Sequence, residues 1–295
     1  MTVTTSAKKT WSILDLVTWG TSYLSEKGFS DARLNIELLL AHVLKLQRIQ
    51  LYTSFDQPLS DDELARFKEV LKRRCANEPL QYILGETEFM GLKFTVDRRV
   101  LIPRSDTEVL VETVLERMKQ TLNNADEVQL LEIGTGSGCI AVSLLKLIPN
   151  AIVTATDISS DALEVAKTNV ERNRVTEKIK LLQSDFLSNT SLPQKFRCIV
   201  FNPPYISNEE YQLLPKEVRE FEPKIALADG NDGLTFFKAF ARKAASLLLD
   251  NGFAAVEHAY NQSESVQKIF QESGWKNIST IKDYGGNFRC VVAER

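Results

Sequence analysis

The tetrapeptide Asn202-Pro203-Pro204-Tyr205 has the residue types to hold a planar nitrogen, and it directly follows the apolar run CIVF. Proline fixes φ and has no N–H, so this turn is rigid and its carbonyls are free to accept hydrogen bonds. The Asn202 side-chain oxygen and the Pro203 carbonyl can take the two protons of an –NH2 group, beside the flat ring of Tyr205. The alternative is a Pro-Pro turn that only ends a strand. We predict that Asn202, Pro203 and Tyr205 act in catalysis and that residues 202–205 contact the substrate.

A second candidate site is the glycine-rich segment Gly134-Thr135-Gly136-Ser137-Gly138, between the apolar run VQLLEI and a helical pattern. Glycines at such a turn let backbone N–H groups approach a ligand at the start of a helix. Because position 139 is cysteine, the spacing is GxGxG and not the GxGxxG of dinucleotide-binding folds. A glycine turn required only for packing is the alternative.

Two further strand candidates end in residues suited to an adenosine. Asp157 closes the run AIVTATD, where a carboxylate can accept hydrogen bonds from both ribose hydroxyls, although it could instead cap the helix that starts near Ser159. Asp185 and Phe186 end the next run and suit an exocyclic amine and a purine face, although the ring could be plain core. Together with the glycine segment they predict an adenosine-containing cofactor, and the GxGxG spacing favours S-adenosylmethionine over NAD.

The elements that must position these residues alternate between helical and strand patterns from residue 104 to the end. This alternation predicts a parallel sheet covered by helices on both faces, with residues 288–293 returning as an antiparallel edge strand. Residues 1–78 have helical apolar spacing, with Ser60 and Glu63 as a capping box, and predict a small helical domain. Residues 79–103 predict a hairpin-like linker, and residues 104–295 the catalytic domain.

Composition narrows the possible partners. The net charge of −3 provides no global positive field for a polyanion. The four cysteines form no CxxC pair and His42 and His258 have no neighbouring ligands in the sequence, so we expect neither a disulfide framework nor a metal site. No apolar leader or membrane-length apolar run is present, and we expect a cytoplasmic protein that is neither secreted nor integral to a membrane.

With these motifs in view, the sequence resembles the HemK/PrmC family of protein-(glutamine-N5) methyltransferases. The matching segments span nearly the whole chain: ARLNIELLLAHVL, EPLQYILGETEF, LIPRSDTEVLVE, LEIGTGSGCIAVSL, FNPPYI, FEPKIALADGNDGL, VEHAYNQ and KDYGGNFR. Two departures are Ser105, where the family usually has proline, and Cys139, where a smaller residue is common. The first affects the rigidity of the turn before it, and the second affects only packing.

The resemblance implies a class I S-adenosylmethionine-dependent methyltransferase fold, Rossmann-like with a mostly parallel seven-stranded sheet, preceded by a small helical domain that recognises the substrate. It implies methylation of the glutamine in the Gly-Gly-Gln motif of peptide chain release factors, with S-adenosylhomocysteine as product and no metal. Cofactor contacts are implied at residues 134–138, Asp157, Phe186 and Asn202. We expect a monomer with no direct nucleic-acid or membrane partner.

Three other functions are compatible with parts of the pattern. A nucleic-acid adenine-N6 methyltransferase could use the same tetrapeptide, because the adenine amino group is also planar and conjugated. A cofactor-binding module without catalysis would not need the intact tetrapeptide. Within the family, a glutamine methyltransferase for a ribosomal protein is the nearest alternative.

Overall fold

The computed structural model describes residues 10–121, 127–188, 192 and 195–295 of the chain. The chain divides into two compact units, one ending at Leu84 and the other beginning at Gly85. Each unit has its own hydrophobic core. The two are therefore described separately.

The first unit is helical, as its apolar spacing predicts. It contains α1 (Ile13–Glu26), α2 (Ala32–Leu44), α3 (Arg48–Tyr52), α4 (Asp61–Cys75) and α5 (Leu80–Leu84). The capping box before α4 is confirmed: the Glu63 N–H donates to the Ser60 hydroxyl and Glu63 Oε2 accepts from the Ser60 N–H at 2.8 Å. Gly20 permits a close crossing of α1 and α2, because a Cβ there would lie 2.7 Å from Ile36 Cδ1.

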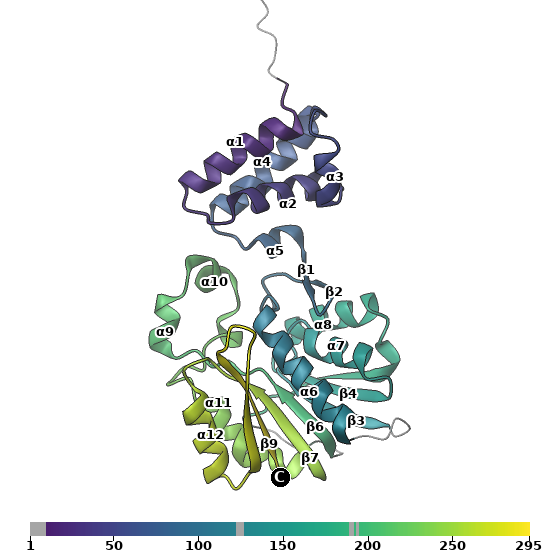
Figure 1. Cartoon of the computed structure of the whole chain (residues 1–295), viewed down its shortest axis with the longest axis vertical. Helices are drawn as coiled ribbons and strands as arrows, with labels where there is room; N and C mark the ends of the chain where they lie inside the picture. Colours follow the sequence, from purple (N-terminus) through teal and green to yellow (C-terminus); the bar gives the residue numbers. More distant parts are fainter. Residues whose placement is uncertain (1–9, 122–126, 189–191, 193–194) are drawn as a thin grey trace, which may run out of the picture. The chain divides into compact units, whose positions relative to one another are not determined.

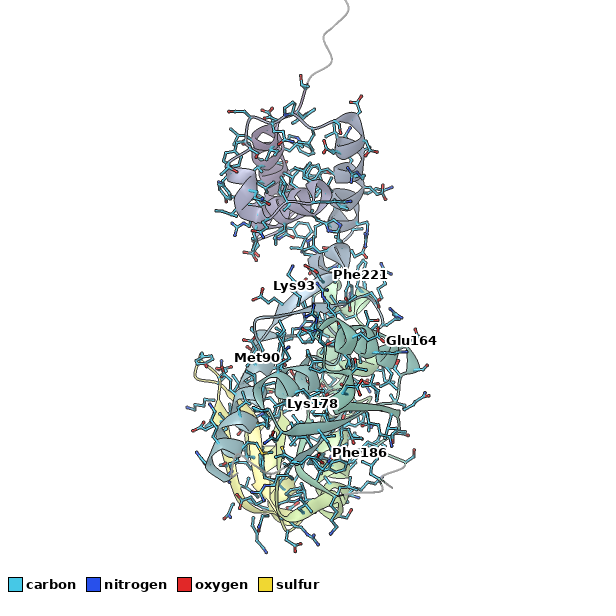
Figure 2. All side chains as sticks on the ribbon, turned by 90° about the vertical axis from the view of Figure 1, so that its right-hand side faces the viewer. Met90, Lys93, Glu164, Lys178, Phe186 and Phe221 are labelled. Atoms are coloured by element: carbon cyan, nitrogen blue, oxygen red, sulfur yellow. The ribbon has the colours of Figure 1, made fainter. Side chains whose placement is uncertain are left out.

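The second unit opens with a hairpin of β1 (Glu86–Phe89) and β2 (Leu92–Thr95), joined by a two-residue turn at Met90 and Gly91 with positive φ (Figure 2). The hairpin is therefore confined to the middle of residues 79–103, and α5 precedes it. The buried Asn169 of α8 (Ser160–Arg172) accepts from Thr95 N at 2.6 Å and donates to the Thr95 carbonyl at 2.9 Å. These bonds fix the hairpin to the second unit.

The described part of the second unit also contains a seven-stranded sheet with the strand order β5-β4-β3-β6-β7-β9-β8. Its strands are β3 (Val128–Ile133), β4 (Ala151–Asp157), β5 (Ile179–Gln183), β6 (Phe196–Phe201), β7 (Leu248–Glu257), β8 (Lys276–Lys282) and β9 (Phe288–Glu294). The first five are parallel, and β9 is antiparallel to both β7 and β8. The mostly parallel α/β fold expected of a class I methyltransferase is confirmed.

The expected edge position of residues 288–293 is wrong. β9 lies inside the sheet, and β8, which the apolar pattern did not reveal, forms the edge. The reason is visible in the residue types: the CVVA stretch of β9 is fully buried, whereas β8 reads KNISTIK and has no buried residue. A polar, half-exposed strand suits an edge and lacks the continuous apolar run of a buried one.

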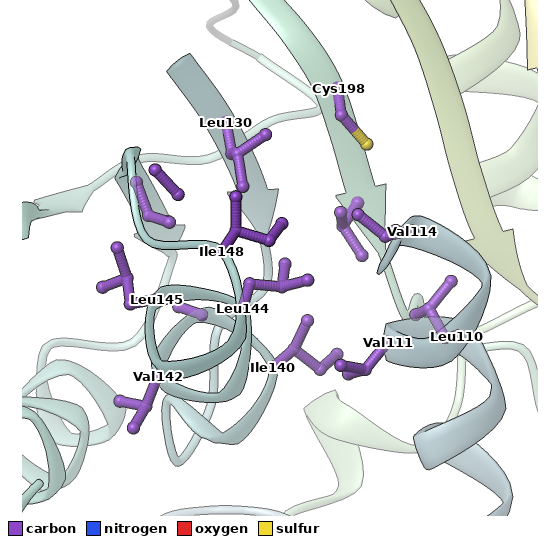
Figure 3. Packing of buried hydrophobic residues seen from close by; sticks show 14 of the residues in the cluster. Leu110, Val111, Val114, Leu130, Ile140, Val142, Leu144, Leu145, Ile148 and Cys198 are labelled. Atoms are coloured by element: carbon purple, nitrogen blue, oxygen red, sulfur yellow. The ribbon is translucent and has the colours of Figure 1, made fainter. Parts of the chain in front are cut away.

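Helices cover both faces of this sheet (Figure 1). α6 (Glu108–Thr121), α7 (Cys139–Leu147) and α8 pack on one face, and α11 (Thr235–Lys243) and α12 (Ser263–Glu272) on the other. Figure 3 shows Ile140 and Leu144 of α7 packed near Leu130 of β3 and Val111 of α6. The short α9 (Asn208–Leu213) and α10 (Lys216–Phe221) lie in the long connection between β6 and β7.

The strand order reverses direction at β3. The chain proceeds outward from β3 to β4 and β5, then returns to the other side of β3 with β6 and β7. Ligands of open α/β sheets bind outside the carboxyl ends of the strands at such a switch point. The glycine segment after β3, Asp157 at the end of β4 and Asn202 after β6 all lie at this edge.

Candidate functional site

A cavity of about 340 Å³ lies at the carboxyl ends of β3, β4 and β6, entirely within the second unit. This volume is within the range of small-molecule sites. Of the predicted site residues, the following line it: Gly134, Thr135, Gly136, Ser137, Asp157, Asp185, Phe186, Asn202 and Pro204. Gly138, Pro203 and Tyr205 are not among the lining residues. Most of the remaining wall is apolar, including Leu101, Pro103, Ile158 and Phe236.

The glycine segment turns tightly from β3 into α7. Gly136 has a φ of +53°, and a Cβ built there would meet nothing within 4 Å, so this residue faces open space at the cavity. Gly138 has a different role: it caps α7, and a Cβ there would lie 3.4 Å from Ala166 of α8. Glycine adopts such positive φ angles far more readily than other residues. The cavity wall therefore depends on glycine at position 136, and the contact between α7 and α8 on glycine at position 138.

Asp157 joins this loop to the end of β4. Its Oδ2 accepts from the Gly136 N–H at 2.8 Å and its Oδ1 from the Ser159 N–H at 2.9 Å. Burial raises the pKa of Asp157, and the backbone N–H groups of Ser159 and Gly136 oppose that rise. Each carboxylate oxygen has two acceptor sites, so each keeps one for a further donor. The cap of α8 comes from Ser159 instead, whose hydroxyl accepts from Ala162 N.

Asp185 and Phe186 lie beyond the end of β5, which closes at Gln183. Both Asp185 oxygens are already engaged in a local turn, with Leu187 N at 2.9 Å and Ser188 Oγ at 2.7 Å, and these bonds hold its pKa low. Phe186, labelled in Figure 2, has its ring centroid 6.1 Å from that of Phe201 and 6.0 Å from that of Phe240. Its ring is thus both a cavity wall and a neighbour of the core.

Asn202 is the polar group of the tetrapeptide that reaches the cavity. Its Nδ2 donates to Thr107 Oγ1 at 3.2 Å, and Oδ1 accepts no hydrogen bond from any described residue. Pro203 is buried, and Tyr205 is half-buried with its hydroxyl 3.2 Å from Glu257 Oε1. Gln262 holds the end of the tetrapeptide by donating to the Tyr205 carbonyl at 2.9 Å.

Two buried glutamates lie behind the wall, and sequence reasoning singled out neither. Glu132 accepts from Thr135 Oγ1 at 2.6 Å, and burial raises its pKa to about 8. Burial likewise raises the pKa of Glu257 to about 7, while Thr107, Tyr205 and Arg289 hold it down. Both lie at or near the ends of apolar strands, at the sheet edge where the other site residues gather. A carboxyl group at the end of an apolar strand could therefore have indicated them from the sequence.

A third unpredicted contact supports two residues of the cavity wall, Pro103 and Arg104. Glu222, whose side chain is buried, forms an ion pair with Arg104 and accepts from Ile102 N at 3.1 Å. Arg104 lines the cavity together with Pro103. Glu222 therefore holds the turn at residues 102–104. In this chain Ser105 follows that turn, where the family usually has proline.

The lining residues fit an adenosylated amino acid. Asp157 offers two free acceptor sites for a ribose diol, Gly136 leaves space beside backbone N–H groups, and Phe186 and Ile158 offer apolar surface for a base. No group of three or more metal-ligating side chains occurs within the described residues. In that same part of the chain, no helix has the length and apolarity needed to cross a membrane.

Two family models match parts of the chain. Residues 15–85 match the family model of the PrmC N-terminal domain, and residues 107–220 match that of the methyltransferase small domain. The solved structure of the hMettl16 catalytic domain in complex with MAT2A 3′UTR hairpin 6 shares the fold alone. It has a TM-score of 0.54 and 16% identity over 80% of this chain and 82% of that chain.

Full-length relatives are more specific. The release factor glutamine methyltransferase of Rhodopirellula baltica is 39% identical over 99% of both chains. That of Geobacter sulfurreducens is 40% identical over 97% of this chain and 98% of its own. Similarity of this extent across both units shows the family. The chain belongs to the release factor glutamine methyltransferases, enzymes of the S-adenosylmethionine-dependent methyltransferase class.

Proposed function

We propose that the chain transfers a methyl group from S-adenosylmethionine to the side-chain amide nitrogen of the glutamine in the Gly-Gly-Gln motif of peptide chain release factors, supporting translation termination. The observation that carries this proposal is the free acceptor Oδ1 of Asn202 in the wall of a cavity that also contains Asp157 and the glycine segment. An acceptor oxygen at this position suits a primary amide, which presents two N–H protons.

The cofactor-binding residues are proposed as follows. Asp157 accepts from the ribose hydroxyls, and Asp185 and Phe186 bind the adenine. The backbone of residues 134–138 faces the amino acid portion, with Gly138 acting through the helix start and not through the cavity wall. Asn202 contributes to cofactor and substrate sites alike. No metal is required in this scheme.

Catalysis is mainly placement. An amide nitrogen is a poor nucleophile because its lone pair is delocalised, whereas the cofactor supplies a sulfonium-bound methyl group that is already electrophilic. Asn202 Oδ1 and the Pro203 carbonyl accept the two N–H protons, orient the nitrogen and stabilise the positive charge that develops on it. Pro204 and Tyr205 border the planar group. The extra proton would pass to solvent water once the new bond has formed, so no base is needed before attack.

The test is methylation of a purified release factor. Full-length enzyme and S-adenosylmethionine are incubated with release factor, and the Gly-Gly-Gln peptide is analysed by tandem mass spectrometry. We expect one added methyl group on that glutamine, and none when the release factor carries asparagine there. Ribosomal proteins and adenine-containing single-stranded DNA and RNA are offered in parallel. Methylation of these substrates and not of the release factor would replace the proposal with one of its alternatives.

We further propose that the helical unit selects the protein substrate. A glutamine and its two glycines offer few atoms for specific capture, so a second contact surface is physically reasonable. All of the cofactor candidates lie after Gly85, in the unit with its own core. The enzyme is expected to act as a monomer, without direct nucleic-acid or membrane binding.

A truncated protein starting at Gly85, the boundary of the second unit, tests this division. Its affinity for S-adenosylhomocysteine should stay within a few-fold of the full chain, whereas methylation of intact release factor should become far slower. Circular dichroism and gel filtration first establish that the truncated protein is folded and soluble, because deletion exposes any apolar surface that the helices cover. Equal rates for both proteins would place recognition in the second unit.

A further inference from the structure

The orientation of the Asn202 carboxamide depends on a hydroxyl outside the tetrapeptide. Thr107, the last residue of the 3-10 turn Ser105–Thr107, is 3% exposed, and its Oγ1 lies 3.2 Å from Asn202 Nδ2. A threonine hydroxyl has one proton and can either accept from an amide nitrogen or donate to an amide oxygen. The direction of this one bond therefore decides whether Asn202 presents its oxygen or its nitrogen to the cavity.

A buried carboxylate lies close to this hydroxyl. Glu257, at the end of β7, is 2% exposed, and Tyr205 donates to its Oε1 at 3.2 Å. The Thr107 hydroxyl faces Glu257 and lowers its pKa, although Oε2 accepts no hydrogen bond of normal geometry within the described residues. Glu257 therefore accepts a hydrogen bond from Tyr205 and lies close to the Thr107 hydroxyl, which makes no hydrogen bond of normal geometry with it in this structure.

An ionised carboxylate can only accept. When Glu257 is ionised, the single Thr107 proton is drawn toward it, and Thr107 Oγ1 is left as an acceptor for Asn202 Nδ2. When Glu257 is protonated, it can donate to Thr107, and the threonine proton becomes free for Asn202 Oδ1. The carboxamide would then turn over and present –NH2 to the cavity, where it would oppose the –NH2 of the substrate.

We propose that Glu257 and Thr107 are positioning residues that hold the Asn202 carboxamide with Oδ1 facing the cavity. Neither lies in the tetrapeptide, and Glu257 acts through Thr107. This inference rests on the proposed function, since it assigns the polarity that a primary amide substrate requires.

The charges around Glu257 favour a change of protonation near neutral pH. Arg289 is the nearby cation, and it is shared with Asp106 at 2.8 Å and Asp283 at 2.9 Å. Asp106 raises the pKa of Glu257, and the remaining titratable neighbours, Tyr205, Cys290 and Cys139, are neutral. Burial outweighs the stabilising groups and places the pKa of Glu257 at about 7.

The first experiment compares full-length variants in the release factor assay. Thr107→Val should lower kcat about tenfold or more with little change in KM for S-adenosylmethionine, because it removes the group that orients a positioned acceptor. Thr107→Ser keeps the hydroxyl and should retain most activity. Thr113→Val is the matched control: this buried hydroxyl donates to the Val109 carbonyl of its own helix, and Thr113 does not line the cavity.

The pH profile separates positioning from a merely structural role. Wild-type kcat should rise with pH up to about 7 as Glu257 ionises, whereas Glu257→Gln should be less active and lose this rise. A wild-type rate for folded Thr107→Val, or the same pH dependence in Glu257→Gln, would overturn the proposal. Melting temperatures of all variants show whether each is folded.

A second measurement is independent of methyl transfer. In protein labelled with ¹⁵N-asparagine, the Asn202 side-chain signals, assigned by their loss in Asn202→Ala, should shift with pH in the wild type. They should not shift in Glu257→Gln or Thr107→Val. If the wild type failed to methylate release factor while this titration was present, the substrate assignment would fall and the positioning contact would stand. A flat titration in the wild type would overturn the contact itself.

Discussion

Replacing Asp157 tests the cofactor site most directly, because the structure shows what its carboxylate already holds. Each oxygen accepts one backbone N–H, from Gly136 at 2.8 Å and from Ser159 at 2.9 Å. One acceptor site per oxygen is left over for a ribose hydroxyl. Asp157→Ala removes both, whereas Asp157→Asn keeps one acceptor oxygen and turns the other position into a donor that faces a backbone N–H.

The expected loss follows from two hydrogen bonds to a charged acceptor, each contributing about 1.5 to 3 kcal/mol. Together they amount to roughly 3 to 6 kcal/mol, or about two to four powers of ten in affinity. Asp157→Asn should lose about half of this free energy. The change in folding stability should be smaller, because the freed N–H groups of Gly136 and Ser159 lie at the cavity and can be hydrated.

Isothermal titration calorimetry with S-adenosylhomocysteine measures the affinity, and differential scanning calorimetry measures the stability. Asp161→Ala is the matched control, since it removes an exposed carboxylate from the first turn of α8 without touching the cavity. If folded Asp157→Ala bound S-adenosylhomocysteine as tightly as the wild type, the ribose would have to lie elsewhere, and the assignment of the whole cavity would need revision.

Two other variants probe the remaining polar groups. Asn202→Ala should reduce turnover by roughly two orders of magnitude or more in a folded protein, because a positioning acceptor acts mostly in the transition state; near-normal turnover would make the tetrapeptide structural. Glu132 has a pKa raised by burial to about 8, so its contribution to the free energy of unfolding is present at low pH and is lost as pH rises from about 5 to 8. Urea unfolding across this range should show Glu132→Gln losing less stability than the wild type, by a few kcal/mol at most, and parallel curves would contradict the raised pKa.

Apolar periodicity was sufficient for most of the fold and failed where a strand is not buried. The apolar runs in β3, β4 and β6, and the FAAV run at the end of β7, are short and bounded by polar residues. The order of helices and strands follows from these runs. β8 is mostly polar, its two isoleucines do not alternate with polar residues, and no side chain is buried, so its sequence lacks the pattern of a strand. The apolar CVVA run of β9 is typical of an interior strand, but no local pattern specifies that its two neighbours are β7 and β8.

The residues that face the cavity could be predicted because ligand chemistry restricts their type. A glycine-rich turn after a strand, a carboxylate after the next strand and an asparagine before two prolines together indicate a ligand site, although glycine at positive φ alone also occurs in turns away from the cavity. The supporting residues are different. Asn169, which joins the hairpin to the Ser137 carbonyl at 2.8 Å, sits in an ordinary helical pattern. Its partners Ser137 and Thr95 lie 32 and 74 residues away in the chain, and Arg104 and Glu222 are 118 residues apart.

The two buried glutamates share an arrangement that explains why the chain keeps carboxyl groups where burial disfavours their charge. Each stands next to a threonine hydroxyl: Thr135 donates to Glu132 at 2.6 Å, and Thr107 faces Glu257. Once it is ionised, a carboxylate takes the threonine proton and leaves the hydroxyl oxygen with a single direction of hydrogen bonding, a state that Glu257 reaches near pH 7 and Glu132 near pH 8. Thr135 belongs to the glycine segment and Thr107 supports Asn202, so the same device lies behind the proposed cofactor loop and behind the proposed substrate acceptor. An apolar residue in place of either glutamate would remove a buried carboxyl group, but it would also leave a threonine free to bond in either direction. Burial of these two carboxyl groups is unfavourable for folding stability. Their role is therefore better explained by the hydrogen-bond directions that they set at the site.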